Sequence, residues 1–155
     1  MIRSLLIANR GEIAVRIVRA ARERGIRAIA VYSEPDRLAP HVLEADEAYL
    51  IGPAASSESY LCAERLIEVA EASGADAIHP GYGFLAERSF FAKAVRDAGL
   101  VFVGPSPEVI AVMGDKTEAR RYMKNVGVPI IPGVTEPVSN VEAALAAAHT
   151  IGFPV

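Results

Sequence analysis

The segment 79–87, HPGYGFLAE, has the residue types of a turn that can bind a ligand. It follows an apolar run, and Pro80 restricts the residue before it to extended backbone geometry. Gly81 and Gly83 flank Tyr82 and can adopt backbone angles that are closed to other residues. Such a turn can hold the tyrosine ring outward and let a flat ligand approach the bare peptide. The alternative is a tight turn whose aromatic rings pack on the next helix, and the segment alone favours neither.

Residues 113–117, MGDKT, predict a break in the chain followed by the start of a helix. Asp115 can cap that helix, and Lys116 then falls within its first turn. A cation at this place is repelled by the positive end of the helix dipole, which is unusual unless an anion compensates it. A bound phosphate would compensate it, whereas the alternative is a Lys116 side chain that simply extends into water.

Residues 8–16, ANRGEIAVR, predict a strand-to-helix turn of the kind that presents backbone N–H groups to a dinucleotide phosphate. The fingerprint of that site needs glycine at three positions, and this turn has Gly11 alone. A dinucleotide site is therefore disfavoured, but it stays open as an alternative.

The helix that follows this turn carries charges on one face. Four residues recur at intervals of four, three and four and so share that face: Glu12, Arg16, Arg19 and Glu23. One interpretation is a solvated stripe with intrahelical ion pairs of about 0.2–0.5 kcal/mol each. Another is a partner surface, because alternating acids and bases can complement themselves across a two-fold axis. The spacing alone favours the solvated stripe.

The elements that must position these candidates alternate along the chain. Short apolar runs predict strands at 4–8, 28–32, 47–51, 75–79 and 100–103. Longer amphipathic stretches predict helices at 11–24, 59–72, 88–98, 107–113, 115–126 and 140–150. Four of these helices are followed by a glycine that can end them: Gly25, Gly74, Gly99 and Gly127. The pattern predicts an α/β fold in which right-handed βαβ units build a doubly wound parallel sheet.

The composition changes after Val126. Residues 127–137 contain three prolines and no helical periodicity, which is typical of a linker between structural units. Ser139 or Asn140 can cap the Ala-rich helix that follows. Residues 151–155, IGFPV, predict the start of a strand, so we expect the chain to be part of a longer polypeptide. The predicted division is a domain at 1–114 and a truncated second unit at 115–155.

The overall composition excludes several classes of protein. Of the 155 residues, 52% are hydrophobic and 23% are charged, as in ordinary globular domains. The net charge of -3 leaves no excess of Lys and Arg to neutralise a nucleic acid backbone. No apolar run approaches the ~20 residues that span a bilayer, so we expect neither nucleic acid nor membrane as a partner.

Metal and disulfide chemistry are not expected within the chain. His41 and His149 have no acid or Cys at metal-ligand spacing, so no metal site is predicted. The single Cys62 and the absence of a leader-like start indicate a reducing, cytoplasmic location.

Taken together, four groups of residues resemble the N-terminal domain of biotin carboxylases. They occur in one order and spacing: IANRGEIA at 7–14, the set Ser33, Asp36, His41, Ala45 and Asp46, HPGYGFL at 79–85, and GDK at 114–116. The family includes the biotin carboxylase subunit of acetyl-CoA carboxylase, which serves fatty-acid synthesis, and the equivalent segments of propionyl-CoA, methylcrotonyl-CoA and pyruvate carboxylases. The resemblance covers essentially the whole chain, and the combination is specific although each piece alone is weak.

The resemblance implies an ATP-dependent ligase that begins with a Rossmann-like domain and continues with an ATP-grasp domain. In its reaction, MgATP activates bicarbonate as carboxyphosphate, and the released CO2 is taken by biotin on a separate carrier protein or domain. A carboxyltransferase subunit or domain then receives the carboxyl group, and the intact enzyme is expected to be a homodimer. The implied cofactors are ATP and Mg2+, with carrier-bound biotin as the substrate.

The same resemblance suggests roles for particular residues. Lys116 is expected to contact a phosphate of ATP. The loop with Tyr82, Gly83 and Glu87 is expected to border the biotin site. Three residues of the charged helix face resemble the dimer surface of the family: Arg16, Arg19 and Glu23.

The chain departs from the family pattern in two ways. Ala86 stands where a Ser usually precedes Glu87, which removes a hydroxyl near the loop. The carboxylates for Mg2+, the general base for bicarbonate and the Arg that steadies biotin would all lie beyond Val155. We therefore expect no catalytic residue within the chain and no turnover by the chain alone. A dinucleotide-binding Rossmann module and a non-catalytic assembly domain stay open as alternatives.

Overall fold

The structure is a computed structural model that describes residues 1–134 and 138–155. Contacts within the chain divide it into two compact units, Met1–Pro107 and Glu108–Val155. The predicted linker at 127–137 ends in Thr135, Glu136 and Pro137, and that part of the prediction lies outside the described residues.

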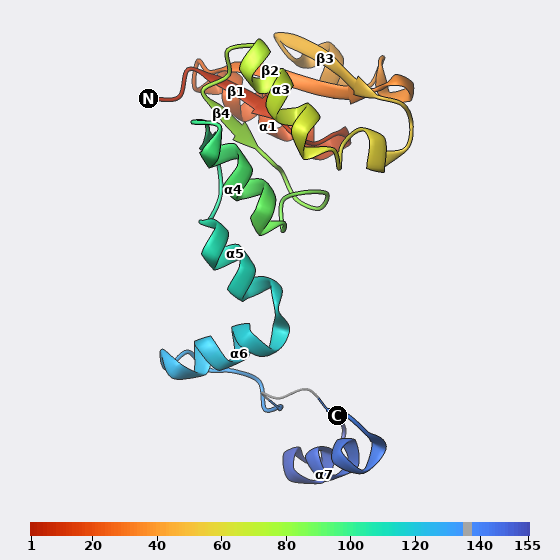
Figure 1. Ribbon diagram of the computed structural model, residues 1–155, viewed down its shortest axis with the longest axis vertical. Coiled ribbons are helices and arrows are strands. Elements are labelled where there is room, and N and C mark those ends of the chain that lie inside the picture. The colour runs from red at the N-terminus through yellow and green to blue at the C-terminus, as the bar shows by residue number, and fades with distance from the viewer. Residues whose placement is uncertain (135–137) are drawn as a thin grey trace. The chain divides into compact units, whose positions relative to one another are not determined.

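The first unit contains a five-stranded parallel sheet with the strand order β3-β2-β1-β4-β5, which confirms the predicted doubly wound α/β fold (Figure 1). The apolar runs form parallel strands because both faces of such a sheet are covered, and residues such as Leu6, Ile29 and Ile78 are fully buried. The strands begin and end within two residues of the predicted bounds: β1 Ser4–Ile7, β2 Arg27–Ser33, β3 Glu47–Gly52, β4 Ala77–His79 and β5 Val101–Phe102.

Four α-helices within residues 1–107 cover the two faces of this sheet. The chain adds β2 and β3 on one side of β1, and then β4 and β5 on the other side, so crossovers of one hand place the helices on opposite faces. On one face, α1 Gly11–Glu23 contacts α2 Pro40–Glu44. On the other face, α3 Ala63–Ala72 contacts α4 Ser89–Asp97 (Figure 1).

Two local features differ from the prediction. The short helix α2 was not predicted, although its first residue Pro40 suits the first turn of a helix. The helix predicted at 59–72 begins only at Ala63, because Ser56–Glu58 form a 3-10 turn ahead of it. Ser59 Oγ donates to Ala55 O at 2.8 Å, a local hydrogen bond that stabilises this turn at the expense of a longer helix.

The predicted helix ends are confirmed. Gly25, Gly74, Gly99 and Gly127 have φ angles of 65°, 64°, 77° and 76°. After α1, for example, Gly25 N–H donates to Arg22 O at 3.0 Å, which satisfies one of the last carbonyls of the helix.

One part of the hydrophobic core lies between α1 and the sheet. The buried face of α1 consists of Ala14, Val18 and Ala21, spaced by four and three residues as in an amphipathic helix. These small side chains pack in one cluster with Leu5 and Ile7 of β1. Burial of one Leu or Ile side chain stabilises a fold by about 1.5–3 kcal/mol, so this packing fixes the position of the turn between β1 and α1.

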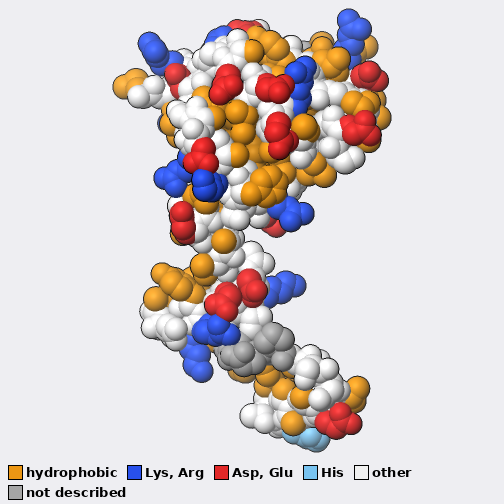
Figure 2. Space-filling view, in the orientation of Figure 1, with side chains coloured by type: hydrophobic (Ala, Val, Ile, Leu, Met, Phe, Trp, Pro, Cys, Tyr) orange, Lys and Arg blue, Asp and Glu red, His pale blue; other side chains and the backbone are white. Residues whose placement is uncertain are grey.

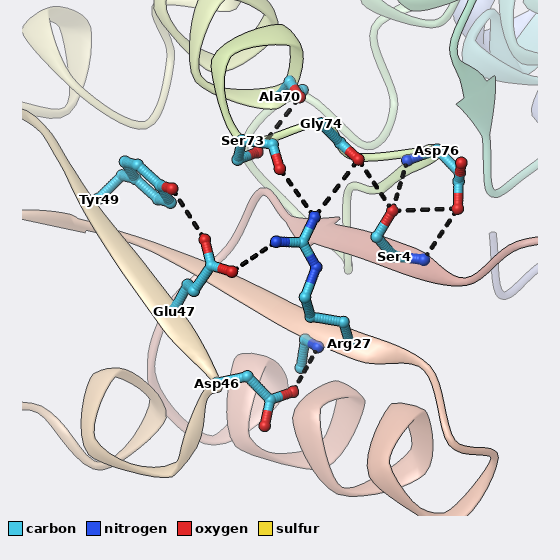
Figure 3. Close-up of polar contacts among 10 residues, drawn as sticks. Ser4, Arg27, Asp46, Glu47, Tyr49, Ala70, Ser73, Gly74 and Asp76 are labelled. Atoms are coloured by element: carbon cyan, nitrogen blue, oxygen red, sulfur yellow. Dashed lines mark hydrogen bonds and ion pairs between the residues drawn. The ribbon is translucent and has the colours of Figure 1, made fainter.

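At the amino ends of the strands, Asp76 joins β1 to the segment before β4 (Figure 3). Its Oδ2 accepts from Arg3 N–H at 2.8 Å, from Ser4 N–H at 3.0 Å and from Ser4 Oγ at 3.0 Å. The hydrogen bond from the Arg3 backbone, followed by that from the Ser4 side chain, lowers the pKa of Asp76. The Asp76 carboxylate therefore accepts from backbone N–H groups at the start of β1, in place of a carbonyl of a neighbouring strand.

Arg27 ties β2 to its neighbours at the same edge. Its guanidinium group pairs with the Glu47 carboxylate of β3 and donates to Ser73 O at 2.7 Å, at the end of α3 (Figure 3). Glu47 also accepts from Tyr49 Oη at 2.8 Å. This edge of the sheet is thus occupied by structural contacts, and the opposite edge stays available for a ligand.

Three helices follow the sheet: α5 Pro107–Gly114, α6 Lys116–Asn125 and α7 Val141–Ile151. Asn140 caps α7, because its Oδ1 accepts from Ala143 N–H at 2.8 Å. The strand predicted at 151–155 is wrong: Ile151 ends α7, and residues 152–155 pair with no strand in the described part of the chain. An apolar run without a partner strand has no ladder to join. No helix in residues 1–134 and 138–155 has the length and apolar character needed to cross a membrane.

Candidate functional site

The carboxyl ends of β1 and β4 lie side by side where the strand order reverses, which is the usual ligand position in open α/β sheets. Ala8 N–H donates to His79 O at 2.9 Å, so the pairing continues to the end of both strands. The two turns that leave these strands are the segments 8–16 and 79–87 of the sequence. They are therefore neighbours in space.

Asn9 joins the two turns. It is 1% exposed, and its Nδ2 donates to Pro80 O at 2.8 Å and to Tyr82 O at 2.9 Å. Its Oδ1 accepts from Arg10 N–H at 2.9 Å, so both amide hydrogens and the amide oxygen are used. This role was not predicted. Its signal in the sequence is a polar residue that directly follows a buried strand.

The two glycines of the loop meet different requirements. Gly81 has a φ of +67°, and a Cβ there would lie 2.6 Å from Asn9 Nδ2 and 2.9 Å from Ile13 Cγ2. Gly83 has a φ of +69°, but a Cβ there would meet open space. Close packing and conformation both require Gly81, whereas conformation alone favours Gly83.

The Tyr82 side chain is largely open to solvent. The residue is 61% exposed, and its hydroxyl donates to Glu12 Oε1 at 2.6 Å. This hydrogen bond raises the pKa of Tyr82, because only the neutral phenol can donate to the carboxylate. Since Glu12 belongs to the first turn of α1, the contact ties the loop to that helix.

Phe84, in contrast, packs inward. Its ring stacks on Tyr60 with centroids 5.2 Å apart, and its φ of 43° is unusual for a bulky residue. Tyr60 is 1% exposed; its hydroxyl donates to Asp36 Oδ2 at 2.8 Å and accepts from Ser33 N–H at 3.2 Å. The loop therefore combines both interpretations of its sequence, with one ring outward and one packed. The contribution of Tyr60 was not predicted.

Asp36 gathers donors at the end of β2. It accepts from Ser33 Oγ at 2.9 Å, from Tyr60 and from Arg10 Nη1 at 3.2 Å. Burial raises the pKa of Asp36, but the hydrogen bonds from Tyr60, Ser33 and Arg10 outweigh burial, and the pKa lies below its ordinary value. Burial and the hydrogen bond to Asp36 raise the pKa of Tyr60. The spaced residues Ser33 and Asp36 thus support the Phe84 side of the loop.

His79 begins the loop from the end of β4. Its Nδ1 accepts from Gly81 N–H at 3.0 Å, and burial lowers its pKa, so the neutral ring with hydrogen on Nε2 is favoured. The ring lines a groove of about 450 Å3 that runs along the side of α1 past Ile13 and Val103.

Glu87 lies exposed at the end of the same loop, just before α4. Among the residues that the structure describes, no hydrogen bond or ion pair joins Glu87 to Tyr82 or Gly83.

Lys116 lies in the first turn of α6, in the second unit, and is exposed. The N-cap Asp115 accepts from Thr117 N–H at 2.8 Å and from Glu118 N–H at 2.9 Å, and these hydrogen bonds lower the pKa of Asp115. The carboxylate of Asp115 therefore already provides the anion that a helix start favours. The position of Lys116 at a helix start therefore does not by itself require a bound phosphate, contrary to the reasoning from the sequence. Whether Lys116 binds ATP is a separate question.

The charged face of α1 is only partly engaged. Arg19 makes two hydrogen bonds of 2.9 Å to the Glu44 carboxylate of α2, so the intrahelical pairing considered for this face is replaced by a contact between helices. Arg16 and Glu23 are exposed, and no ion pair within residues 1–134 and 138–155 holds either of them. Together with Glu12, these residues line an open hollow of about 480 Å3.

No group of three or more His, Cys, Asp or Glu side chains in the described ranges is placed to hold a metal ion. On the face of the first unit shown in Figure 2, acidic, basic and apolar side chains are interspersed.

Two known families match successive parts of the chain. Residues 1–110 match the family described as biotin carboxylase, N-terminal domain. Residues 115–155 match the family described as carbamoyl-phosphate synthase L chain, ATP binding domain.

Individual relatives agree with these matches. Biotin carboxylase 2 of Bacillus subtilis is 54% identical over the whole chain, which spans 35% of that protein. Mitochondrial pyruvate carboxylase of Mus musculus is 52% identical over 99% of the chain, which spans 13% of that protein. The chain thus covers about a third of the length of the bacterial biotin carboxylases, or less of the longer relatives.

Solved structures show the same similarity. The biotin carboxylase domain dimer of Hydrogenobacter thermophilus 2-oxoglutarate carboxylase, in complex with MgADP, ADP and bicarbonate, has a TM-score of 0.91 and 47% identity. A biotin carboxylase complex with β,γ-ATP from Campylobacter jejuni has a TM-score of 0.92 and 47% identity. In both cases the similarity covers 99% of this chain and 34% of the other.

Proposed function

Because the chain belongs to the biotin carboxylase N-terminal domain family, we propose that it forms the first part of an ATP-dependent biotin carboxylase. The observation that carries the proposal is the loop 80–84, which Asn9 holds at the switch point of the sheet with Tyr82 and Gly83 exposed. Ligands of open α/β sheets bind at that position. The match of residues 115–155 to an ATP-binding domain supports a nucleotide as co-substrate.

The proposed reaction has two stages. An oxygen of bicarbonate attacks the γ-phosphorus of ATP, which releases ADP and forms carboxyphosphate. Carboxyphosphate then breaks down to phosphate and CO2. A ureido nitrogen of biotin gives its proton to the released phosphate and bonds to the CO2 carbon. The Hydrogenobacter thermophilus relative was solved with MgADP and bicarbonate, which supports this choice of substrates.

Four residues of the chain receive binding roles in this proposal. Lys116 binds a phosphate of ATP; its exposed ammonium group has no acidic partner in the described residues. Tyr82, Gly83 and Glu87 border the biotin site, and the outward position of Tyr82 and Gly83 supports this assignment more directly than anything at Glu87 does.

Magnesium would neutralise charge on the phosphates of ATP during transfer. The described residues do not fit a magnesium site, because they contain no cluster of suitable ligands. We therefore assign no step of the reaction to magnesium-binding residues of this chain.

A homodimer is part of the proposal, with Arg16, Arg19 and Glu23 of α1 at the interface. The exposed, partly unpaired charges of this face support it, and the Hydrogenobacter thermophilus relative is named as a dimer. In the full-length protein, Arg19→Glu should shift sedimentation from dimer toward monomer. Unchanged sedimentation would contradict the role of this face.

The remaining partners follow from the chemistry of biotin. A carrier protein or domain must bring biotin to the site, and a carboxyltransferase subunit or domain must consume carboxybiotin. The relatives include an acyl-coenzyme A carboxylase alpha3 subunit from Mycobacterium leprae, which is consistent with separate partners of this kind.

The organisation of the chain is also part of the proposal. We propose a Rossmann-like domain at 1–114 and the start of an ATP-grasp domain at 115–155; the family matches end at residue 110 and begin at residue 115, which supports this boundary. A cytoplasmic location is supported by the lone Cys62, which has no partner for a disulfide within these 155 residues.

An assay of ADP release tests the proposed function. The full-length protein should cleave MgATP faster in the presence of bicarbonate when free biotin is added, whereas the 155-residue chain should show no turnover. Equal rates with and without biotin would contradict the proposal. Binding of NADH in a fluorescence titration would favour the dinucleotide alternative instead.

A further inference from the structure

We infer that Asn9 is a positioning residue that directs the backbone N–H of Gly83 outward as a hydrogen-bond donor for the ligand of the loop. The inference rests on the proposed function, since it takes biotin as that ligand. It concerns a buried residue that does not itself touch the ligand.

The peptide group between Tyr82 and Gly83 carries the inference. Its carbonyl oxygen accepts from Asn9 Nδ2 at 2.9 Å. This peptide bond is trans, and in a trans peptide the C=O and N–H groups point in opposite directions, so the Gly83 N–H points away from Asn9. Gly83 is exposed, and no acceptor within residues 1–134 and 138–155 pairs with its N–H.

Two neighbouring residues cannot supply such a donor. Pro80 has no N–H, and the N–H of Gly81 donates to His79 Nδ1 at 3.0 Å. The N–H groups of Tyr82 and Phe84 also have no acceptor in the described residues, but Asn9 holds the carbonyl of the peptide group that carries the Gly83 N–H. Asn9 therefore orients the unpaired N–H of Gly83.

The orientation of the Asn9 amide is fixed by its surroundings. Its Oδ1 accepts from Arg10 N–H, and a flipped amide would place that oxygen against the carbonyl oxygens of Pro80 and Tyr82. Such a flip would leave the buried Pro80 carbonyl and the partly buried Tyr82 carbonyl without this donor, and an unsatisfied buried group costs about 1–3 kcal/mol. The Tyr82–Gly83 peptide is consequently held in one orientation before any ligand arrives.

A fixed, outward N–H suits the chemistry of biotin. The ureido oxygen of biotin is a hydrogen-bond acceptor, and negative charge grows on it when a ureido nitrogen loses its proton. A donor that is already oriented stabilises such a charge without reorganisation. Misplacement of the donor by about 1 Å can reduce the rate by about a hundredfold, so loss of the Asn9 contacts should affect biotin specifically.

The test uses Asn9→Asp in the full-length enzyme, because this change keeps the shape of the side chain and removes both donors. The matched control is Asn140→Asp, since a carboxylate can accept from Ala143 N–H as the Asn140 side chain does. Asn9→Asp should lower kcat/KM for free biotin about tenfold or more, while the KM for ATP and the biotin-independent cleavage of ATP stay within about twofold. The control should leave all three values unchanged.

Two results would overturn the inference alone: a folded Asn9→Asp enzyme with an unchanged kcat/KM for biotin, or one whose biotin-independent cleavage of ATP falls by the same factor as kcat/KM for biotin. A wild-type enzyme whose ATP cleavage ignores biotin would overturn the proposed function as well.

If Asn9→Asp does not fold, hydrogen exchange in the wild-type enzyme tests whether the Gly83 N–H binds biotin. Saturating biotin should slow exchange in the peptide that contains Gly83 and leave α7 unchanged. Equal exchange at Gly83 with and without biotin would overturn the inference.

Discussion

Replacement of Gly81 by alanine tests the packing between the two turns of the site. A Cβ at this position would lie 2.6 Å from Asn9 Nδ2, so either the amide or the loop must move. The left-handed backbone angle adds about 1–2 kcal/mol of strain for a residue with a Cβ. Overpacking against a buried side chain costs a further 1–3 kcal/mol or so, about 2–5 kcal/mol in total.

Gly83→Ala is the matched control for this change. Gly83 has nearly the same φ, +69° against +67°, but a Cβ there meets open space. The control should therefore lose only the strain, about 1–2 kcal/mol. The difference between the two variants isolates the close approach of Gly81 to Asn9.

Urea unfolding of the wild-type chain and both variants measures these values. We expect Gly81→Ala to lower the free energy of unfolding by about 1–3 kcal/mol more than Gly83→Ala does, with unchanged slopes. Equal losses in the two variants would refute the reasoning, because they would mean that the contact between Gly81 and Asn9 is not tight.

Three further predictions concern other parts of the chain. Asp76→Asn should lower the midpoint of thermal unfolding at pH 7. Hydrogen bonds, led by that from Arg3 N–H, lower the pKa of Asp76, so the carboxylate stabilises the fold at pH values above its ordinary pKa of 3.8. The difference in unfolding midpoint between wild type and variant should therefore shrink as the pH falls through the lower pKa of the folded state. A deficit that is constant from pH 7 to strongly acidic pH would contradict this. Tyr60→Phe removes a buried hydroxyl that donates to a carboxylate and should cost about 1.5–3 kcal/mol in urea unfolding, whereas Tyr49→Phe, near the surface, should change little. Lys116→Gln in the full-length protein should weaken MgATP binding about tenfold or more by calorimetry with the fold intact, and an unchanged affinity would remove Lys116 from the nucleotide site.

The fold was predictable because its signals are local. Apolar runs, amphipathic periods and the glycines after four of the helices define the βαβ units without reference to distant residues. The short helix α2 and the delayed start of α3 were missed because they depend on turn chemistry, such as the hydrogen bond from Ser59 Oγ, that competes with helical periodicity.

The candidate site was predictable only in part. The loop 79–87 and its position at the carboxyl edge followed from the sequence, whereas the contacts that hold it did not. Asn9 and Tyr60 lie far from Tyr82 and Phe84 in the sequence, and no spacing rule connects them. Lys116 shows the opposite case: the local rule about the helix dipole suggested a phosphate, but the neighbouring Asp115 already satisfies that rule.

The most direct test of the proposed function follows the oxygen atoms of bicarbonate. Full-length protein is incubated with MgATP, biotin and bicarbonate labelled with heavy oxygen, and the released phosphate is analysed by mass spectrometry. If bicarbonate attacks the γ-phosphorus to form carboxyphosphate, one labelled oxygen stays on phosphorus when CO2 leaves, and carboxybiotin appears in step with ADP. Phosphate that carries no oxygen from bicarbonate, with no carboxybiotin formed, would contradict the assignment of this chain to an ATP-dependent biotin carboxylase.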